Sequence, residues 1–252
     1  MTYKFNGPTA TGTGLYFQSG NDALPMDKLQ SFWPLRAAGG TSGHITSPDL
    51  VGNSPLGANA VVGWIASNPV AGGALGAADF SLATNYWMTR GDPTDYCAVA
   101  RSKKWWLSFW FYPKAGAASD VIVARSSSGS TGWFAQILTG GELLFNMNNG
   151  SWLSCQTSNT GTYDAWNFGV IGHDGSTGFV SLNGGTAATL TRGIVDAGVT
   201  WGITFGNWWA PGNDFLGYVA DSAYFVDVSA NATATEIAAL YNGGNGNTLI
   251  GG

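Results

Sequence analysis

The most hydrophobic stretch of the chain lies at residues 105–112, where six of the eight residues are aromatic and none is charged. Aromatic side chains favour β-strands, in which successive side chains point to opposite faces. Each face of this predicted strand carries three aromatic residues: Trp105, Phe109 and Phe111 on one face, and Trp106, Trp110 and Tyr112 on the other. Because neither face is polar, we expect a central strand whose second face is covered by another layer, a ligand or a partner chain.

The segments after this strand have the length and alternation of further short strands. We predict strands over residues 121–125, 133–138, 142–147, 152–156, 166–173, 179–182, 201–205 and 215–226. Strand-like segments before it cover residues 29–36, 80–88 and 96–100. Gly140-Gly141 and Asn183-Gly184 predict hairpin turns, and the second suits a type I′ turn because both central residues need positive φ. Many short strands joined by tight turns predict an antiparallel sandwich.

A single helix is predicted near the end of the chain. Thr233 and Glu236 have the spacing of a capping box, in which each side chain accepts from the other residue's backbone N–H. Ile237, Leu240 and Tyr241 follow at spacings of three and four, so they share one helix face. A helix of about two turns is not stable by itself, and we expect this face to dock on the sandwich.

The composition fits a single domain with an arm. A chain of 252 residues could form two small domains or one large one, and we favour one because no linker divides it. The chain is 44% hydrophobic and has 38 glycines, which suits short strands and tight turns. Residues 1–28 are polar and rich in Gly and Thr, so we expect an N-terminal arm that contacts another subunit, followed by one domain over residues 29–252.

Charge and cysteine content exclude several classes of protein. The net charge of −5 argues against a nucleic-acid partner. The first residues lack the long apolar run of a signal peptide or a membrane anchor. We therefore expect synthesis in a cytoplasm and no membrane contact. Cys97 and Cys155 match no metal-ligand spacing. We expect free, buried thiols, with a disulfide as the alternative in an oxidising compartment.

Six segments together resemble the laminin-G-like, concanavalin A-like jelly-roll family. They are residues 31–35 (SFWPL), 47–53 (SPDLVGN), 107–113 (LSFWFYP), 179–184 (FVSLNG), 217–225 (GYVADSAYF) and 233–242 (TATEIAALYN). The resemblance covers about residues 29–245. It implies an all-β fold: a concanavalin A-like antiparallel jelly-roll sandwich with one short C-terminal helix, here preceded by the arm.

The resemblance also implies a calcium site, because family members often hold this ion with a D-x-x-G-N loop and an aspartate of a late strand. Those positions correspond to Asp49, Asn53 and Asp221. Carboxylate, amide and carbonyl oxygens are suitable calcium ligands. The alternative is that Asp49 and Asn53 only shape a turn and that Asp221 only accepts from backbone donors. No cofactor is required by either interpretation.

Enzymatic activity is not expected. Glycoside hydrolases of this fold use an E-x-D-x-x-E strand, and the reaction needs two carboxylates across a cleft. The chain has only two glutamates: Glu236 is explained by the cap, and Glu142 has no acidic residue two or four positions on. His44 and His173 lie beside turns, and no G-x-S-x-G motif is present, so structural or solvated histidines are expected.

The remaining aromatic residues suggest contact with sugars or with other subunits. Sugars stack on Trp and Tyr while amides and carboxylates bind their hydroxyls. Two segments combine these types, and the candidate ligand residues are Trp208, Trp209, Asn213, Asp214, Asn148 and Trp152. The alternatives for them are core packing or a subunit interface, which also favour aromatic residues.

We therefore expect a non-enzymatic structural protein of a bacteriophage virion, as a capsid-decoration, head-fibre or tail-attached subunit. The few charges, the absence of a catalytic set and the arm support this hypothesis. Its expected partners are copies of itself, for example in a trimer, other virion proteins and a cell-surface glycan. The alternative is a carbohydrate-binding, lectin-like module, and a polysaccharide hydrolase is the third hypothesis.

Overall fold

The structure is a computed structural model that describes residues 23–35, 46–47, 49, 51, 55–58, 62–65, 76–81, 88–89, 104–116, 120–126, 131–194, 202–207 and 214–244. Its strands are β1 (Leu29–Trp33), β2 (Thr46–Ser47), β3 (Leu56–Ala58), β4 (Gly63–Ile65), β5 (Ala77–Asp79), β6 (Met88–Thr89), β7 (Trp105–Pro113), β8 (Asp120–Arg125), β9 (Trp133–Ile137), β10 (Leu143–Asn148), β11 (Trp152–Gln156), β12 (Asn167–His173), β13 (Thr177–Leu182), β14 (Ala188–Thr191), β15 (Thr204–Phe205) and β16 (Gly217–Val226). Its helical segments are η1 (Met26–Lys28), α2 (Ala234–Tyr241) and η2 (Asn242–Gly244). None of the helices in this part of the chain is long and apolar enough to cross a lipid bilayer.

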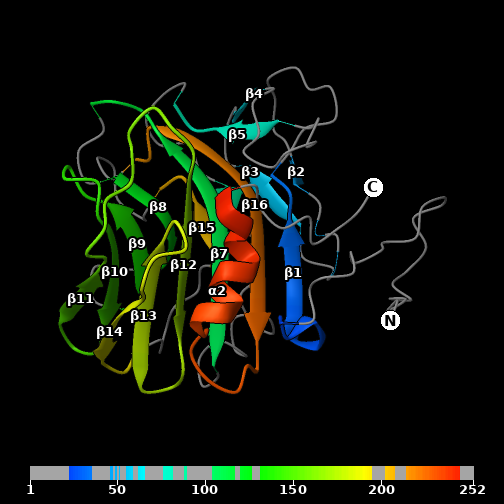
Figure 1. Cartoon of the computed structure of the whole chain (residues 1–252). Coiled ribbons are helices and arrows are strands. Elements are labelled where there is room, and N and C mark those ends of the chain that lie inside the picture. The colour runs from blue at the N-terminus through cyan, green and yellow to red at the C-terminus, as the bar shows by residue number, and fades with distance from the viewer. Residues whose placement is uncertain are drawn as a thin grey trace.

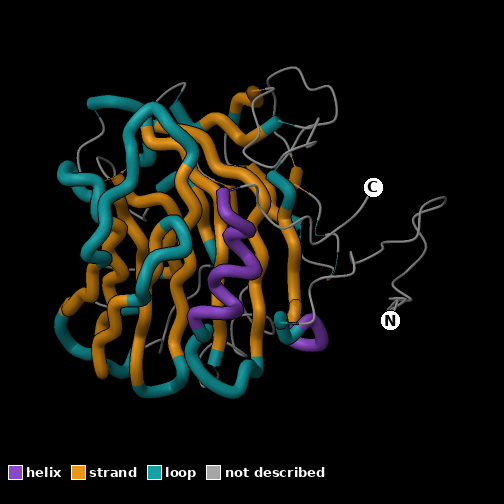
Figure 2. The backbone as a smooth tube through the Cα atoms, in the orientation of Figure 1, coloured by secondary structure: helices purple, strands orange, loops and turns teal. Residues whose placement is uncertain are grey.

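Two antiparallel sheets form the described part of the molecule (Figures 1 and 2). The first sheet runs in the order β14-β13-β12-β7-β16-β5-β4, and the second in the order β11-β10-β9-β8-β15-β6-β3-β2. Strand β16 also pairs with β1: it pairs with β7 along most of its length, with β5 at Tyr218 and Val219, and with β1 from Ser222 to Phe225. The predicted all-β antiparallel sandwich with a short C-terminal helix is confirmed.

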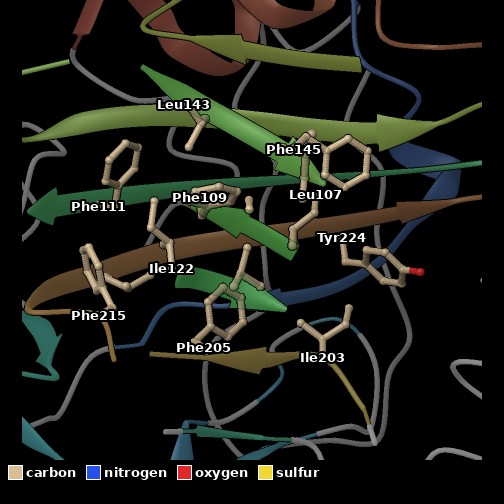
Figure 3. Close-up of a cluster of buried hydrophobic side chains, with 14 of the residues drawn as sticks. Leu107, Phe109, Phe111, Ile122, Leu143, Phe145, Ile203, Phe205, Phe215 and Tyr224 are labelled. Atoms are coloured by element: carbon tan, nitrogen blue, oxygen red, sulfur yellow. The ribbon is translucent and has the colours of Figure 1, made fainter. Parts of the chain in front are cut away.

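One face of β7 lies in the core between the sheets. Its odd-numbered side chains from Trp105 to Phe111 are buried in a single cluster with residues of the second sheet. Figure 3 shows Ile122 of β8 and Phe145 of β10 in this cluster. Trp105 stacks on Trp133 of β9 with their ring centroids 4.7 Å apart. Each such buried side chain contributes about 1.5–3 kcal/mol to folding, so β7 is a main source of stability.

The opposite face of β7 is covered by the helix. Trp106 and Trp110 share a second buried cluster with Ile237 and Leu240 of α2. Tyr241, at the end of α2, stacks on Trp110 with ring centroids 6.1 Å apart and planes at 27°. Figure 1 shows α2 lying across the middle of this sheet. The layer expected over the second apolar face is therefore supplied by the chain itself.

Some element boundaries differ from the prediction for local reasons. The strand expected over 29–36 ends at Trp33, because Pro34 follows and Leu35 adopts a left-handed backbone with φ 51°. The strand expected over 80–88 does not begin at Phe80, because β5 ends at Asp79 and Phe80 and Ser81 lie in no strand. Residues 82–87 lie outside the described part, and β6 begins at Met88. The strand expected over 96–100 lies outside the described residues.

The described end of the predicted arm lies on the helix-covered face. Leu24 is 6% exposed and belongs to the second cluster, against which Met26 also packs. Turn η1 then leads directly into β1, which begins at Leu29 as expected. Residues 1–22 lie outside the described part, so the contact of the arm with another subunit stays a prediction.

Candidate functional site

The first group of predicted ligand residues lies in the loop between β15 and β16. Three of them are outside the described residues: Trp208, Trp209 and Asn213. Asp214 is buried, and its carboxylate accepts a hydrogen bond from the Asn207 side chain. Phe215 N–H donates to the Gly206 carbonyl at 2.8 Å, so both contacts join the described segments on either side of residues 208–213. A ligand contact by Asp214 stays a prediction.

The second group, Asn148 and Trp152, lies at the hairpin between β10 and β11, where the two residues pair in register. Asn148 is 1% exposed, and its Oδ1 accepts from Gly150 N–H at 2.9 Å, so its side chain shapes the turn. Trp152 is half-buried, and its ring centroid lies 5.0 Å from that of Phe134 on β9. Both rings are on the outer face of the second sheet, in a cluster separate from the core.

Polar side chains continue this outer face beside the two rings. In the strand register, Asn146 lies between Phe134 and Ser154, while Gln136 and Gln156 lie in the next row on either side of β10. Residues that are directly opposite each other share a face of the sheet. Gln136 and Asn146 are half-buried, and Ser154 and Gln156 on β11 are exposed. We call this surface the aromatic–amide face: Phe134, Gln136, Asn146, Trp152, Ser154 and Gln156.

An arginine fixes the hairpin that carries Trp152. Arg192 follows β14 at the edge of the first sheet, and its Nη2 donates to Asn149 O at 3.1 Å, Ser151 O at 2.7 Å and Ser151 Oγ at 2.9 Å. The side chain therefore ties the hairpin of one sheet to the edge of the other. Residues whose backbone is held in this way bind a ligand with a lower entropy cost.

The sequence pointed to this region through Asn148 and Trp152 but missed most of the face. Gln136 and Phe134 come from the neighbouring strand, and their alternation already placed them on one side of it. The pattern did not show which side would be outer, because Phe134 is as apolar as its core-facing neighbours. The register of three strands decides which side chains become neighbours.

The predicted calcium residues are only partly described. Asp49 Oδ1 accepts from Phe32 N–H and Val51 N–H, both at 3.1 Å, and Oδ2 accepts from Ser31 Oγ at 2.5 Å. Asp221 lies in the bulge of β16 with φ 42°, and its N–H donates to Pro34 O at 3.1 Å.

Among the described residues, no three carboxylate, histidine or cysteine side chains gather as a metal site. Asn53 lies outside the described residues, and a calcium ion at this loop stays a prediction.

Glu236, one of the two glutamates considered for acid–base chemistry, has a structural partner. Glu236 Oε2 accepts from Thr233 N–H at 2.7 Å and Glu236 N–H donates to Thr233 Oγ1 at 3.3 Å, which confirms the capping box. Cys155 is a free, buried thiol whose pKa is raised by burial to about 11, so it is a poor nucleophile at neutral pH. Cys97 and His44 lie outside the described residues.

Comparison with known proteins shows the fold alone. No family model matches the chain, and no curated protein matches it. Among solved structures, domain 4 of AbnA, a GH43 extracellular arabinanase from Geobacillus stearothermophilus in complex with arabinotriose, matches with a TM-score of 0.59 and 14% identity. The alignment covers 83% of this chain and 96% of that domain.

Two longer proteins contain a similar unit. The binding domain of botulinum neurotoxin DC, in complex with SialylT, has a TM-score of 0.56 and 17% identity over 90% of this chain. Trypanosoma rangeli sialidase, in complex with 2,3-difluoro-KDN, has a TM-score of 0.61 and 10% identity over 93% of this chain. The chain spans 52% of the first protein and 34% of the second. The chain has the concanavalin A-like sandwich architecture.

Proposed function

We propose that the chain is a glycan-binding module whose aromatic–amide face binds a neutral sugar. The observation that carries the proposal is the half-buried Trp152 ring, packed at 5.0 Å against Phe134, with Asn146 and Gln136 beside Phe134 on the same face. Aromatic rings provide a flat apolar surface for the C–H face of a sugar, and amides both donate to and accept from its hydroxyls. The six residues of the face are uncharged, which suits a neutral ligand.

The comparisons support this proposal over the virion role that the sequence led us to expect. The similar structures include a domain in complex with arabinotriose and a binding domain in complex with SialylT. At these identities the likeness concerns the fold, so binding by this chain depends on its own residues. The virion role, the oligomer and the cytoplasmic synthesis stay predictions from the sequence.

Binding without turnover is part of the proposal. Glycoside hydrolysis requires two carboxyl groups on either side of the scissile bond. The aromatic–amide face contains no carboxylate or histidine. We therefore expect no release of reducing sugar from any polysaccharide that the protein binds.

The first prediction concerns Trp152. Replacing it with alanine removes the stacking surface, and we expect the signal on a glycan array of neutral oligosaccharides to fall at least about tenfold, as for a central binding residue. The matched control is Leu153→Ala, which truncates the next residue of the same strand. Leu153 is 48% exposed and points to the other side of β11, so this variant keeps the signal.

Two results would reject the proposal: no glycan bound by the wild-type protein, or equal losses in Trp152→Ala and Leu153→Ala. Asn146→Ala separates stacking from hydroxyl recognition. It is expected to change the ranking of the glycans, because an amide reads hydroxyl positions, whereas Trp152→Ala weakens all of them. Thermal unfolding of each variant shows whether the fold is kept.

A further inference from the structure

A second group of aromatic side chains lies on the face of the first sheet that carries α2 (Figure 1). Tyr112 of β7 and Tyr218 of β16 pair in register, and Trp166 directly precedes β12. Their ring centroids are 5.6 Å apart for Tyr112 and Trp166, 5.1 Å for Tyr112 and Tyr218, and 6.4 Å for Trp166 and Tyr218. All three residues are half-buried, so part of each is open to solvent. We call them the aromatic triad.

A lysine lies at the border of the triad. Lys114 Nζ is 4.8 Å from the centroid of the Tyr218 ring and donates to Ser81 Oγ at 2.5 Å. Ser81 is held in turn by Asp79, whose Oδ1 accepts from its N–H at 2.8 Å and from its hydroxyl at 2.5 Å. Lys114 forms no ion pair with any residue that the structure describes. An ammonium group has three N–H donors, so Lys114 can still bind an anion.

The loop before Trp166 is fixed by hydrogen bonds from both ends. Asp164 N–H donates to Pro113 O at 2.8 Å, and Ala115 N–H donates to Asp164 Oδ1 at 3.1 Å. Asn167, which is 1% exposed, bonds through its side-chain amide to three backbone groups of the preceding loop. The indole is therefore positioned before a ligand arrives, which lowers the entropy cost of binding.

We propose that the aromatic triad and Lys114 form a second sugar-binding surface, and that its ligand is a sugar with a carboxylate, such as a sialic or uronic acid. The apolar side of the sugar ring stacks on the Trp166 indole, and its carboxylate accepts from Lys114 Nζ. The Tyr112 ring, whose plane lies at 75° to the indole, borders the sugar. The inference rests on the proposed function in treating the chain as a glycan binder. It adds a separate surface and an acidic class of ligand.

Charge decides between this ligand and a cation. Aromatic groups also attract quaternary ammonium ions. Here Lys114 already occupies one side of the Tyr218 ring, and a second cation would be repelled by it. A neutral sugar would contact the rings but offer no negative charge to the ammonium, whereas a sugar acid uses both the rings and the charge.

The test follows the indole N–H signal of Trp166 by NMR in the full chain, with the signal assigned by Trp166→Phe. The probes are sodium N-acetylneuraminate and sodium glucuronate, and the controls are N-acetylglucosamine, glucose and sodium acetate at equal ionic strength. We expect a saturable shift with a sugar acid that exceeds the shift with any control. In Lys114→Met the dissociation constant rises about tenfold, the scale of one charge-assisted hydrogen bond, and Lys114→Arg retains most of the affinity.

The proposal is overturned by no shift with either acid, by equal binding of acetate, or by equal binding of the neutral sugars. If Lys114→Met and Lys114→Arg bind alike, the charge has no role and the proposal also fails. Thermal unfolding of these variants confirms that they fold. The two surfaces fail separately: loss of array binding in Trp152→Ala concerns only the aromatic–amide face, and the Trp166 shift concerns only the triad.

Discussion

His173 shows how the fold selects one form of a titratable side chain. Its Nε2–H donates to Arg192 O at 2.6 Å, and its Nδ1 accepts from Gly175 N–H at 3.0 Å. The side chain is therefore neutral, with the proton on Nε2. Burial lowers the pKa of His173, although the Arg192 hydrogen bond and the Asp174 charge oppose this shift. Of the two roles expected from the sequence, structural and solvated, the structural role is confirmed.

This pKa shift predicts a dependence of stability on pH. Because the folded pKa lies below the unfolded value of about 6.5, the unfolded chain binds more protons between these two values. The contribution of His173 to the free energy of unfolding is therefore complete above about pH 6.5. It falls as the pH drops from this value towards the lower pKa of the folded protein. Urea unfolding at about pH 8 and about pH 5 measures the change.

The control for this prediction is His173→Gln, which cannot titrate. Carboxylates elsewhere also lose stability at low pH, so the wild-type loss contains their contribution as well. We expect the glutamine variant to lose less between the two pH values than the wild type. Equal losses in the two proteins would show that His173 does not contribute.

Among the elements, helix α2 illustrates the difference between local and tertiary signals. Its start was predictable, since the capping box of Thr233 and Glu236 uses only residues within one turn. It ends at Tyr241, because Asn242 adopts the left-handed conformation, with φ 47°. The position of the helix on Trp110 depends on contacts that no local pattern specifies.

The turn Asn183-Gly184 lies against Tyr241 of this helix, and a substitution in the turn tests the contact. Both residues have positive φ, at 50° and 70°, as a type I′ turn requires. A Cβ at Gly184 would lie 2.6 Å from Tyr241 Cδ1. Gly184→Ala therefore combines backbone strain of about 1–2 kcal/mol with displacement of the Tyr241 ring. We expect a lower free energy of unfolding, measured by urea unfolding, and a shifted NMR signal of the Tyr241 ring.

Gly175→Ala provides the matched comparison. Gly175 has φ 97°, and nothing lies within 4 Å of a Cβ built there, so this variant has backbone strain without a clash. A larger loss of stability in Gly184→Ala than in Gly175→Ala measures the contact between the turn and the helix. If the two losses are the same, the contact between the turn and the helix does not contribute to stability.

At the scale of the whole molecule, the two candidate surfaces lie on opposite outer faces of the sandwich. The aromatic–amide face belongs to the second sheet, and the aromatic triad belongs to the first. Packed sheets are separated by about 10 Å, and the side chains of each outer face extend away from that core. The two proposed surfaces therefore share no residues.

This separation predicts that variants of the two surfaces act independently. The losses of unfolding free energy in Trp152→Ala and Trp166→Ala should add in the double variant to within about 0.5 kcal/mol, because distant sites without shared partners are additive. Urea unfolding of the two single variants and the double variant measures this. A larger coupling energy would mean that the faces communicate through the core.

The order of the elements along the chain was largely determined by the sequence alone. The alternation in β7, the turn at Asn183-Gly184 and the helix cap each depend on residues a few positions apart, and local geometry is sufficient to predict them. The resemblance to concanavalin A-like domains also indicated the sandwich correctly. The absence of a catalytic pair stays a prediction.

Only the tertiary structure decided which side chains become neighbours. Trp152 is close to Phe134 because the consecutive strands β9, β10 and β11 pair in a particular register. Trp166 is close to Tyr218 because β12, β7 and β16, which are distant in sequence, lie side by side in the first sheet. A shift of one residue would reverse the face of every side chain in a strand. The sequence therefore specified which residues could form an aromatic surface, and the pairing of the strands decided which of them are covered and which meet solvent.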